Sequence, residues 1–450
     1  MNPSAIDIVS DHRRMPPLHR GGALYLGNLY AIFYGDGSRT RELMGRVSGF
    51  FGYGGRLLPI VDLLYPQGPN LLLLEQIPDP PLLDLLGGHL ALSLPRFEVI
   101  EPEQASTFEQ GLASRPDLLP QAGIQPGFWI DGFVADAELE RLGHHFGLRP
   151  ATTCIASRHA NDKSRLRLFL ESQGLPRFDG GLVHNLEDVA RMGIQLRGMG
   201  YRRAALRAAI GASGFGFWPV DLEGGDPLPD PPHLFEHGPA LLEGWLAPGV
   251  DGIDEVTSPS VQFFIAQDDS VCLYDLTGQI LRERAIHEGN IAPPVDLPTS
   301  EVAAALVEYS RPLVAWLHSQ GYRGPGSIDF LVVQRGSNWE VKICEINARV
   351  TGATYPSLLA RRLLPGGGWM LRNVLLAPGQ NAAALIAALH DSGLMFKPGG
   401  ERGVIPENLI HGDGGKLIKG QMLFMAPTSH ECLQLADELA RRLHHRLRYE

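Results

Sequence analysis

Cysteine is scarce in this sequence: there are four among 450 residues, and no two of them stand in a CxxC pair. Cysteines spaced this widely do not suggest the disulfide framework of a small secreted protein. Three of the four lie in apolar surroundings of the kind in which free thiols are buried. The cysteine pattern therefore predicts a protein of a reducing compartment.

Long apolar runs are also missing. No segment has the ~18 consecutive apolar residues of a membrane-spanning helix, and Met1–Gly22 lacks the apolar core and the cleavage site of a secretory signal. We therefore expect a cytoplasmic protein without a membrane partner. Basic residues are in the minority, 39 against 50 acidic ones, for a formal net charge of −11. An acidic chain binds nucleic acid poorly, so no nucleic-acid partner is expected.

The length predicts two or three packed units, because single cores rarely grow beyond ~250 to 300 residues. The first ~150 residues alternate between strand and helix patterns, with strands expected over Ala23–Gly35 and Asn70–Leu74 and a helix over Arg39–Phe51. This alternation predicts an α/β layer with a parallel sheet. The glycines of 52–55 match no phosphate-binding spacing, and we interpret them as turns.

The strongest functional signal lies in Gly326–Pro356. Two segments rich in β-branched and aromatic residues, Ser327–Gln334 and Trp339–Asn347, flank the turn formers 336–338, which is typical of a β-hairpin. Both strands are apolar on both faces, which indicates a buried sheet.

Three oxygen-bearing side chains are predicted to gather on one face of this hairpin. Side chains alternate along a strand, so a loop over 336–338 places Asp329 opposite Glu345, and Asn347 joins the same face. Two carboxylates and an amide oxygen suit Mg²⁺, which takes one or two carboxylates plus phosphate oxygens. The alternative is a pair of acids on an exposed polar face, but acids embedded in an apolar sheet need a partner such as a metal.

The pattern D-F-L-V-V, a turn and C-E-I-N-A-R resembles the metal-binding hairpin of ATP-grasp carboxylate-amine ligases. The resemblance implies an α/β protein with an α+β lid, that is, an ATP-grasp fold preceded by an α/β pre-ATP-grasp domain. It implies that Asp329, Glu345 and Asn347 hold two Mg²⁺ ions between the β- and γ-phosphates of ATP. Arg349 would be a catalytic residue beside the acyl-phosphate.

A second matching segment precedes the expected lid. Asn161 or Asp162 can cap a helix that ends at Gly174. The order D-K, a basic residue four positions later and then G-L-P is similar to the ATP-grasp pattern, and it implies that Lys163 and Arg167 bind ATP. The alternative is a surface helix with basic residues on its solvated side.

A strand over Ala204–Ala209 leads into a glycine-rich loop, which lets backbone N–H groups approach phosphate oxygens. The loop resembles the ATP-grasp lid, where the strand usually supplies a lysine in place of Arg207. Arginine keeps the charge and can bind phosphate in a bidentate manner, so Arg207 would both bind ATP and assist catalysis. The implied ATP-binding residues of this segment are Arg207, Gly211, Ser213, Gly214 and Gly216.

The segment Leu241–Asp251 is similar to the ATP-grasp hinge, whose E-x-W-L strand meets the adenine edge. Glu243, Trp245 and Leu246 match this pattern, and Asp251 or Asp254 would hold the ribose. The alternative is a core tryptophan at a turn with surface acids.

Residues 258–262 and 277–279 resemble a subset of these ligases that carry a preceding domain, the pheganomycin-type peptide ligases of natural-product biosynthesis. We accordingly expect a pre-ATP-grasp domain over 1–155, a lid and nucleotide-binding subdomain over 156–265 and a C-terminal subdomain with the metal hairpin over 266–450. Within the last we expect a long helix that is capped by Thr299 or Ser300, runs to Gln320 and is interrupted near Pro312.

The resemblance implies an ATP- and Mg²⁺-dependent ligase that joins a small-molecule carboxylate to an amine or peptide through an acyl-phosphate. Two alternatives stay open: an ATP-binding module without ligase turnover, and an acyl-phosphate enzyme with a non-amine acceptor. A homodimer is the default oligomeric expectation. Substrate specificity is expected in the N-terminal unit, in Gly352–Ser357 and in Gly393–Gly420.

Overall fold

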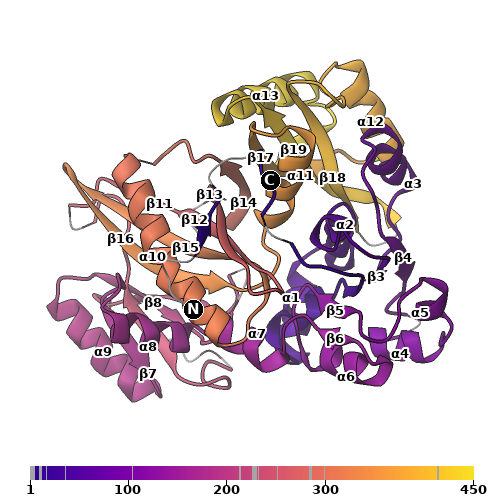
Figure 1. The fold of residues 1–450 in the computed structure, drawn as a ribbon. Coiled ribbons are helices and arrows are strands. Elements are labelled where there is room, and N and C mark those ends of the chain that lie inside the picture. Colours follow the sequence, from indigo (N-terminus) through magenta and orange to yellow (C-terminus); the bar gives the residue numbers. More distant parts are fainter. Residues whose placement is uncertain are drawn as a thin grey trace.

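The computed structural model describes most of the chain, and its strands form three sheets. Within the described residues the sheets have five, four and eleven strands. Figure 1 shows the five-stranded sheet at the lower right, the four-stranded one at the lower left and the large sheet above and between them. No helix in this part of the chain has the length and apolar character needed to cross a membrane. The described residues are 6–9, 13–16, 18–35, 37–103, 105–211, 214–224, 231, 233–250, 252–282, 286–297, 299–412 and 415–450.

The five-stranded sheet is parallel throughout, as the alternating pattern predicted. Its strand order is β4-β3-β2-β5-β6, so the order reverses between β2 and β5, where ligands commonly bind at the carboxyl ends of parallel strands. Its strands are β2 (Ala23–Leu26), β3 (Asn70–Leu74), β4 (Arg96–Val99), β5 (Trp129–Gly132) and β6 (Arg149–Pro150). Its helices are η2 (Leu29–Phe33), α1 (Gly37–Arg46), η3 (Phe50–Leu57), α2 (Val61–Leu64), α3 (Pro80–Leu83), η4 (Asp84–His89), α4 (Phe108–Ala113), α5 (Leu118–Gln121) and α6 (Ala137–Phe146).

The four-stranded sheet is antiparallel, in the order β7-β10-β8-β9. The predicted cap of its first long helix is confirmed, because Asp162 Oδ1 accepts from the Ser164 N–H at 2.8 Å and Gly174 ends the helix at φ 63°. The elements are α7 (Cys154–Ala160), α8 (Lys163–Gln173), β7 (Gly180–Val183), α9 (Leu186–Gly198), β8 (Arg203–Arg207), β9 (Phe217–Asp221) and β10 (Ala240–Gly244).

The eleven-stranded sheet collects strands from both ends of the chain. Its main path runs β11-β15-β12-β13-β14-β17-β19-β18, and β1 pairs with β13 in parallel. Strands β12 and β13 pair with each other, so the expected division at residue 265 falls between two bonded strands. The strands are β1 (Asp7–Ile8), β11 (Glu255–Thr257), β12 (Pro259–Ile265), β13 (Val271–Arg282), β14 (Ile286–Ala292), β15 (Gly324–Arg335), β16 (Asn338–Asn347), β17 (Gly368–Leu376), β18 (Gly403–His411), β19 (Leu417–Ala426) and β20 (Leu447–Tyr449).

Four helices accompany this sheet: α10 (Ser300–Ser319), α11 (Thr354–Leu363), α12 (Ala382–Asp391) and α13 (Ser429–Arg442). Helix α10 crosses one face of the sheet in Figure 1 and runs through Pro312 without a break, so the predicted interruption is wrong. Leu313, Val314 and Leu317, which follow the proline, are buried against the sheet. This packing offsets the hydrogen bond that the proline removes.

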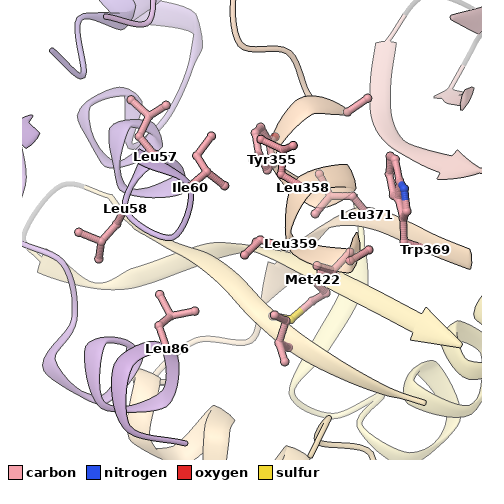
Figure 2. Close-up of a cluster of buried hydrophobic side chains, with 14 of the residues drawn as sticks. Leu57, Leu58, Ile60, Leu86, Tyr355, Leu358, Leu359, Trp369, Leu371 and Met422 are labelled. Atoms are coloured by element: carbon pink, nitrogen blue, oxygen red, sulfur yellow. The ribbon is translucent and has the colours of Figure 1, made fainter. Parts of the chain in front are cut away.

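The N-terminal unit lies directly on the large sheet. The glycines of 52–55, predicted as turns, belong instead to the 3₁₀ helix η3, which packs on β18. Asn408 donates to the Gly52 carbonyl at 3.1 Å. A Cβ added at Gly55 would stand 2.6 Å from Asn408 Oδ1, so this close approach favours glycine there. Figure 2 shows Leu57 and Ile60 of this unit facing Tyr355 of α11 across one continuous apolar core.

Gly49, just before η3, is the tightest point of this contact. Its φ is 70°, and an added Cβ would collide with the Ile410 side chain and stand 2.6 Å from the His411 carbonyl oxygen.

We predict that Gly49→Ala lowers the stability of the protein by about 1 to 3 kcal/mol, through left-handed strain and the clash. Gly45→Ala in α1 is the control, because open space surrounds its Cβ position; there we expect a gain of about 0.5 kcal/mol. Thermal unfolding midpoints of the two variants should move in opposite directions, and equal midpoints would contradict the packing of η3 on β18.

Candidate functional site

The hairpin β15–β16 contains a bulge that sequence reasoning did not foresee. The strands are joined by a two-residue loop, with Arg335 paired to Asn338, so the predicted three-residue loop is wrong. The register then shifts, because Phe330 pairs with Ile343 whereas Asp329 pairs with Glu345. The predicted pairing of the two acids is thus confirmed, and the structure reaches it with one extra residue in β16.

That extra residue, Cys344, changes which side chains of β16 face the core. Ile343 and Ile346 both lie in the core although they are three positions apart. The bulge therefore puts Glu345 and Asn347 together on the opposite side. The bulged carbonyl of Cys344 accepts from both terminal nitrogens of Arg207, at 3.2 Å each.

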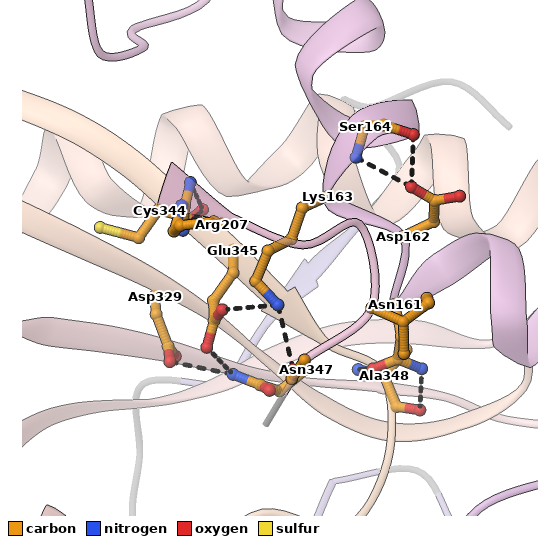
Figure 3. Close-up of polar contacts among 12 residues, drawn as sticks. Asn161, Asp162, Lys163, Ser164, Arg207, Asp329, Cys344, Glu345, Asn347 and Ala348 are labelled. Atoms are coloured by element: carbon orange, nitrogen blue, oxygen red, sulfur yellow. Dashed lines mark hydrogen bonds and ion pairs between the residues drawn. The ribbon is translucent and has the colours of Figure 1, made fainter. Parts of the chain in front are cut away.

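The predicted metal residues form one hydrogen-bonded group (Figure 3). Asn347 Nδ2 donates to Asp329 Oδ2 at 2.9 Å and to Glu345 Oε1 at 3.3 Å. Lys163 Nζ lies 3.1 Å from Glu345 Oε2. Ser327 Oγ donates to Asp329 Oδ1 at 3.0 Å. Strands β15 and β16 and the first turn of α8 thus meet at a single point.

The residues that carried the finer ligase resemblance border this group. Ser260 pairs with Thr277 across β12 and β13, and Gln279 Nε2 donates to Ser260 Oγ at 3.0 Å. Hydrogen bonds from Ser260 and Gln279 reach Asp329. A polar row on two neighbouring strands therefore supports the Asp329 carboxylate.

The two carboxylates differ in their charge environment. Burial, together with the neighbouring Glu345 charge, raises the pKa of Asp329 to about 6. Burial would also raise the pKa of Glu345, but the charges of Lys163 and Arg207 outweigh it and lower that pKa to about 2. The charges of Lys163 and Arg207 stabilise ionised Glu345, whereas ionised Asp329 is stabilised chiefly by neutral hydrogen-bond donors.

This donor set fits Mg²⁺. Two carboxylates and one amide are what the ion takes from a protein when phosphate oxygens complete its shell. Within the described parts of the chain, no three His, Cys, Asp or Glu side chains gather to hold a metal unaided. Asn347 turns its NH₂ toward both acids, so its amide must rotate to present Oδ1 to a cation.

Lys163 connects the acids to the glycine-rich loop. Its Nζ donates to the Gly211 carbonyl at 3.1 Å, and its backbone N–H donates to Ala209 at 2.9 Å. Farther along the loop, Gly214 and Gly216 adopt φ values of 79° and 77°. Ser213, which was also predicted here, lies outside the described residues.

Glu243 is the counter-ion of two buried arginines, a role that sequence reasoning missed. Its Oε2 lies 2.5 Å from Arg207 Nη2 and its Oε1 lies 3.5 Å from Arg167 Nη1. Arg167 also donates to the Phe178 and Gly180 carbonyls, at 2.8 and 2.6 Å, so its guanidinium is held inside the protein. Burial opposes the charge of Arg207, but Glu243 and Glu345 raise its pKa overall.

Arg349 is held by hydrogen bonds to two asparagines. Its Nη1 donates to Asn347 Oδ1 at 2.6 Å and to Asn161 Oδ1 at 3.3 Å. Asn161, predicted only as a possible cap, also exchanges hydrogen bonds with the Ala348 backbone. Arg349 lines a small cavity of about 20 Å³ together with Phe133, which follows β5 at the switch point of the parallel sheet.

The hinge residues lie farther out. The Trp245 ring packs 5.5 Å from the Phe217 ring and 5.0 Å from the Arg203 guanidinium, and Leu246 is half-buried beside it. Asp254, one of two predicted ribose acids, accepts from the Gly336 N–H at 2.6 Å and so holds the hairpin loop. The other, Asp251, lies outside the described residues.

No protein-family model matches the chain, and no curated protein matches its sequence. Solved structures match it over nearly their whole length. One is the Staphylococcus aureus N5-carboxyaminoimidazole synthetase complexed with ADP. It is 14% identical with a TM-score of 0.55, and the match covers 96% of this chain and 99% of that one. A biotin carboxylase from Campylobacter jejuni in a β-γ-ATP complex is 15% identical with a TM-score of 0.56, covering 95% and 92%.

A third structure is the biotin carboxylase domain dimer of Hydrogenobacter thermophilus 2-oxoglutarate carboxylase, with MgADP, ADP and bicarbonate. It is 12% identical with a TM-score of 0.55, and the match covers 95% of this chain and 90% of that one. At such identities the likeness establishes the fold. The chain has the mixed α/β ATP-grasp fold, as the hairpin and its upstream segments predicted.

We predict that Glu243→Gln destabilises the protein by about 3 kcal/mol, because it leaves the buried Arg207 guanidinium without the carboxylate that contacts it. Arg167 keeps a second carboxylate, since its Nε lies 2.7 Å from Glu171 Oε1. Glu223→Gln is the control: this glutamate also pairs with an arginine, at 3.5 Å, but both side chains are at least 60% exposed. Thermal unfolding should show a large loss for the first variant and little change for the second. Equal midpoints would contradict a stabilising role for Glu243.

Proposed function

We propose that the protein is an ATP-dependent ligase that joins a carboxylate to an amine. The observation that carries this proposal is the pairing of Asp329 with Glu345 across the bulged hairpin. Asn347 and Lys163 contact the pair, and Arg349 donates to Asn347. Acidic and basic side chains lie next to one another there. Such an arrangement suits a magnesium-bound triphosphate and a transferring phosphoryl group.

ATP and Mg²⁺ are the cofactors that we propose for this site. Asp329, Glu345 and Asn347 would hold the metal, which neutralises phosphate charge when bound. Lys163 would then move its charge from Glu345 toward the phosphates, next to the backbone of the Gly211–Gly216 loop. Trp245 and Leu246 would border the adenine, with Ser213 and Asp251 as further proposed contacts. Solved neighbours in complex with ADP, MgADP and β-γ-ATP support this assignment.

In the first proposed step, a carboxylate oxygen of the substrate bonds to the γ-phosphorus, and the bond to the β-phosphate oxygen breaks. ADP leaves, and an acyl-phosphate remains. In the second step an amine nitrogen bonds to the acyl carbon, phosphate leaves, and the nitrogen loses a proton. Arg349, held rigid by Asn347 and Asn161, would stabilise the charge that develops in both steps.

Arg207 and Arg167 have less direct proposed roles. Arg207 pairs with Glu243 and donates to the bulged Cys344 carbonyl. It would therefore hold the bulge in place and add positive charge to the site. Its Nε has no hydrogen-bond partner among the described residues. Arg167, with its nitrogens on protein acceptors, would hold the Glu243 carboxylate in place for Arg207.

A peptide or amino acid acceptor is the finer form of the proposal, and it rests on the polar row of Ser260, Thr277 and Gln279 that resembles the pheganomycin-type ligases. A second candidate is transfer to another acceptor, including carboxyl transfer from bicarbonate. The neighbouring structures named as carboxylases favour it. Homodimerisation remains a prediction.

We predict that wild-type protein releases ADP and phosphate from MgATP only when an acid and an amine are both supplied. Glu345→Gln should lower this release by about 100-fold or more, because it removes a proposed metal ligand. Glu340→Gln, an exposed acid on the same strand, is the matched control and should keep wild-type rates.

The assay should scan amino acids, short peptides and bicarbonate. Release driven by bicarbonate without any other acid would favour the second candidate. ATP binding without acid-dependent turnover under any pairing would refute both.

A further inference from the structure

A second bulge in the same sheet contains an acid. Glu407 is the extra residue between Pro406 and Asn408 of β18, which pair with successive residues of β19. Its side chain is fully buried, and neither carboxylate oxygen has a hydrogen-bond partner among the described residues. Burial raises the pKa of Glu407 well above its usual range. Buried carboxylates are normally bonded, so one without a partner requires an explanation.

Arg56 of η3 provides the opposite charge nearby. Its guanidinium lies 5.2 Å from the Tyr355 ring centre and 4.9 Å from that of Phe133. Helix η3 packs on β18, and Asn408, the residue after Glu407, donates to the Gly52 carbonyl of this helix at 3.1 Å. Arg56 and Glu407 thus come from elements in direct contact, yet no ion pair joins the two among the described residues. The Arg56 Nε is also buried there without a hydrogen-bond partner. A carboxyl group and a guanidinium in one interior region therefore each keep bonding capacity that no described protein group uses.

Tyr355 adds a hydroxyl to the same region. Gln421 Nε2 donates to this hydroxyl at 3.2 Å, whereas the contact from Arg56 Nη1 is long, at 3.4 Å. A contact of that length is weak and readily replaced. Figure 2 places Tyr355 where α11 faces the N-terminal unit. Arg56, Tyr355 and Glu407 come from the three segments in which specificity was expected.

The Arg56 cluster, meaning Arg56, Tyr355 and Glu407, connects to the candidate site. Phe133, against which Arg56 packs, lines the same cavity as Arg349. A ligand held by the cluster would thus lie close to the residue that we place beside the acyl-phosphate.

We propose that the Arg56 cluster is the subsite for an α-amino acid, with Glu407 binding its ammonium group and Arg56 its carboxylate. The assignment rests on the proposed ligase function and narrows it. An ammonium held by a buried carboxylate keeps its proton and is not a nucleophile. The bound amino acid is therefore the substrate that supplies the carboxylate, and a different molecule supplies the attacking amine.

The first test is calorimetric binding, in MgADP, of glycine, L-alanine, L-phenylalanine, L-glutamate and L-lysine, each beside its N-acetyl derivative. We expect at least one free amino acid to bind wild-type protein and to bind Glu407→Gln about 30-fold more weakly, the value of a charge-assisted hydrogen bond. The acetylated form should not bind. Equal binding to both proteins, binding of the acetylated form or no binding of any amino acid would overturn the proposal.

Two variants guard against a general folding effect. Glu138→Gln is the control, because this glutamate is equally buried but its carboxylate is bonded to the Tyr30 hydroxyl and the Glu109 N–H. It should keep wild-type amino acid affinity. Arg56→Lys keeps the charge and should weaken binding less than Arg56→Met does. Glu407→Gln should unfold no earlier than wild type, since its carboxylate lacks protein partners; a large drop would indicate a structural role instead.

Hydroxylamine separates failure of this proposal from failure of the ligase function. It traps an acyl-phosphate as a hydroxamate whatever the natural amine is. Hydroxamate formed from an amino acid equally by wild type and Glu407→Gln would refute the subsite and keep the ligase. Glu407-dependent binding without hydroxamate or ADP release from any acid would keep the subsite and refute the ligase.

Discussion

A single extra residue in β16 determines the geometry of the candidate site. Without the bulge at Cys344, strict alternation would place Glu345 on the same side as Ile343, inside the core. With it, Ile343 and Ile346 both stay buried while Glu345 meets Asp329. The displaced Cys344 carbonyl then leaves the ladder and receives Arg207. The pairing of the acids and the anchoring of the arginine are consequences of one local irregularity.

Charge balance explains why the surrounding residues stand where they do. Ionised groups taken out of water need partners at contact distance. Glu243 satisfies Arg167 and Arg207 together, and Glu345 satisfies Lys163. Burial and the Glu345 charge raise the pKa of Asp329, which has chiefly neutral donors to oppose them. The charges of Lys163 and Arg207 instead lower the pKa of Glu345. The unbalanced negative charge lies where the donor set suits a divalent cation.

Features that depend on residues close together in the sequence were predicted, and contacts between distant segments were missed. Helix caps such as Asp162 follow from one side chain and the N–H groups just after it, so they were foreseen. The pairing of Asp329 with Glu345 was right although its assumed loop was wrong, and the three-residue step from Ile343 to Ile346 was the signal that could have revealed the bulge. Glu243 forms ion pairs with Arg167 and Arg207, which lie in other segments, and the residues around Glu243 give no sequence signal for these partners.

The two bulges of the large sheet differ in what they leave unsatisfied. At Cys344 the freed carbonyl accepts from Arg207, and the neighbouring Glu345 is paired with Lys163. At Glu407 the acid finds no donor among the described residues, although Arg56 is near enough to act on its pKa. Bulges gather near functional sites because they redirect a side chain at little cost to the sheet. Both Glu407 oxygens and the Arg56 Nε lack partners among the described residues, and a ligand that carries both charges, a zwitterion, would supply them.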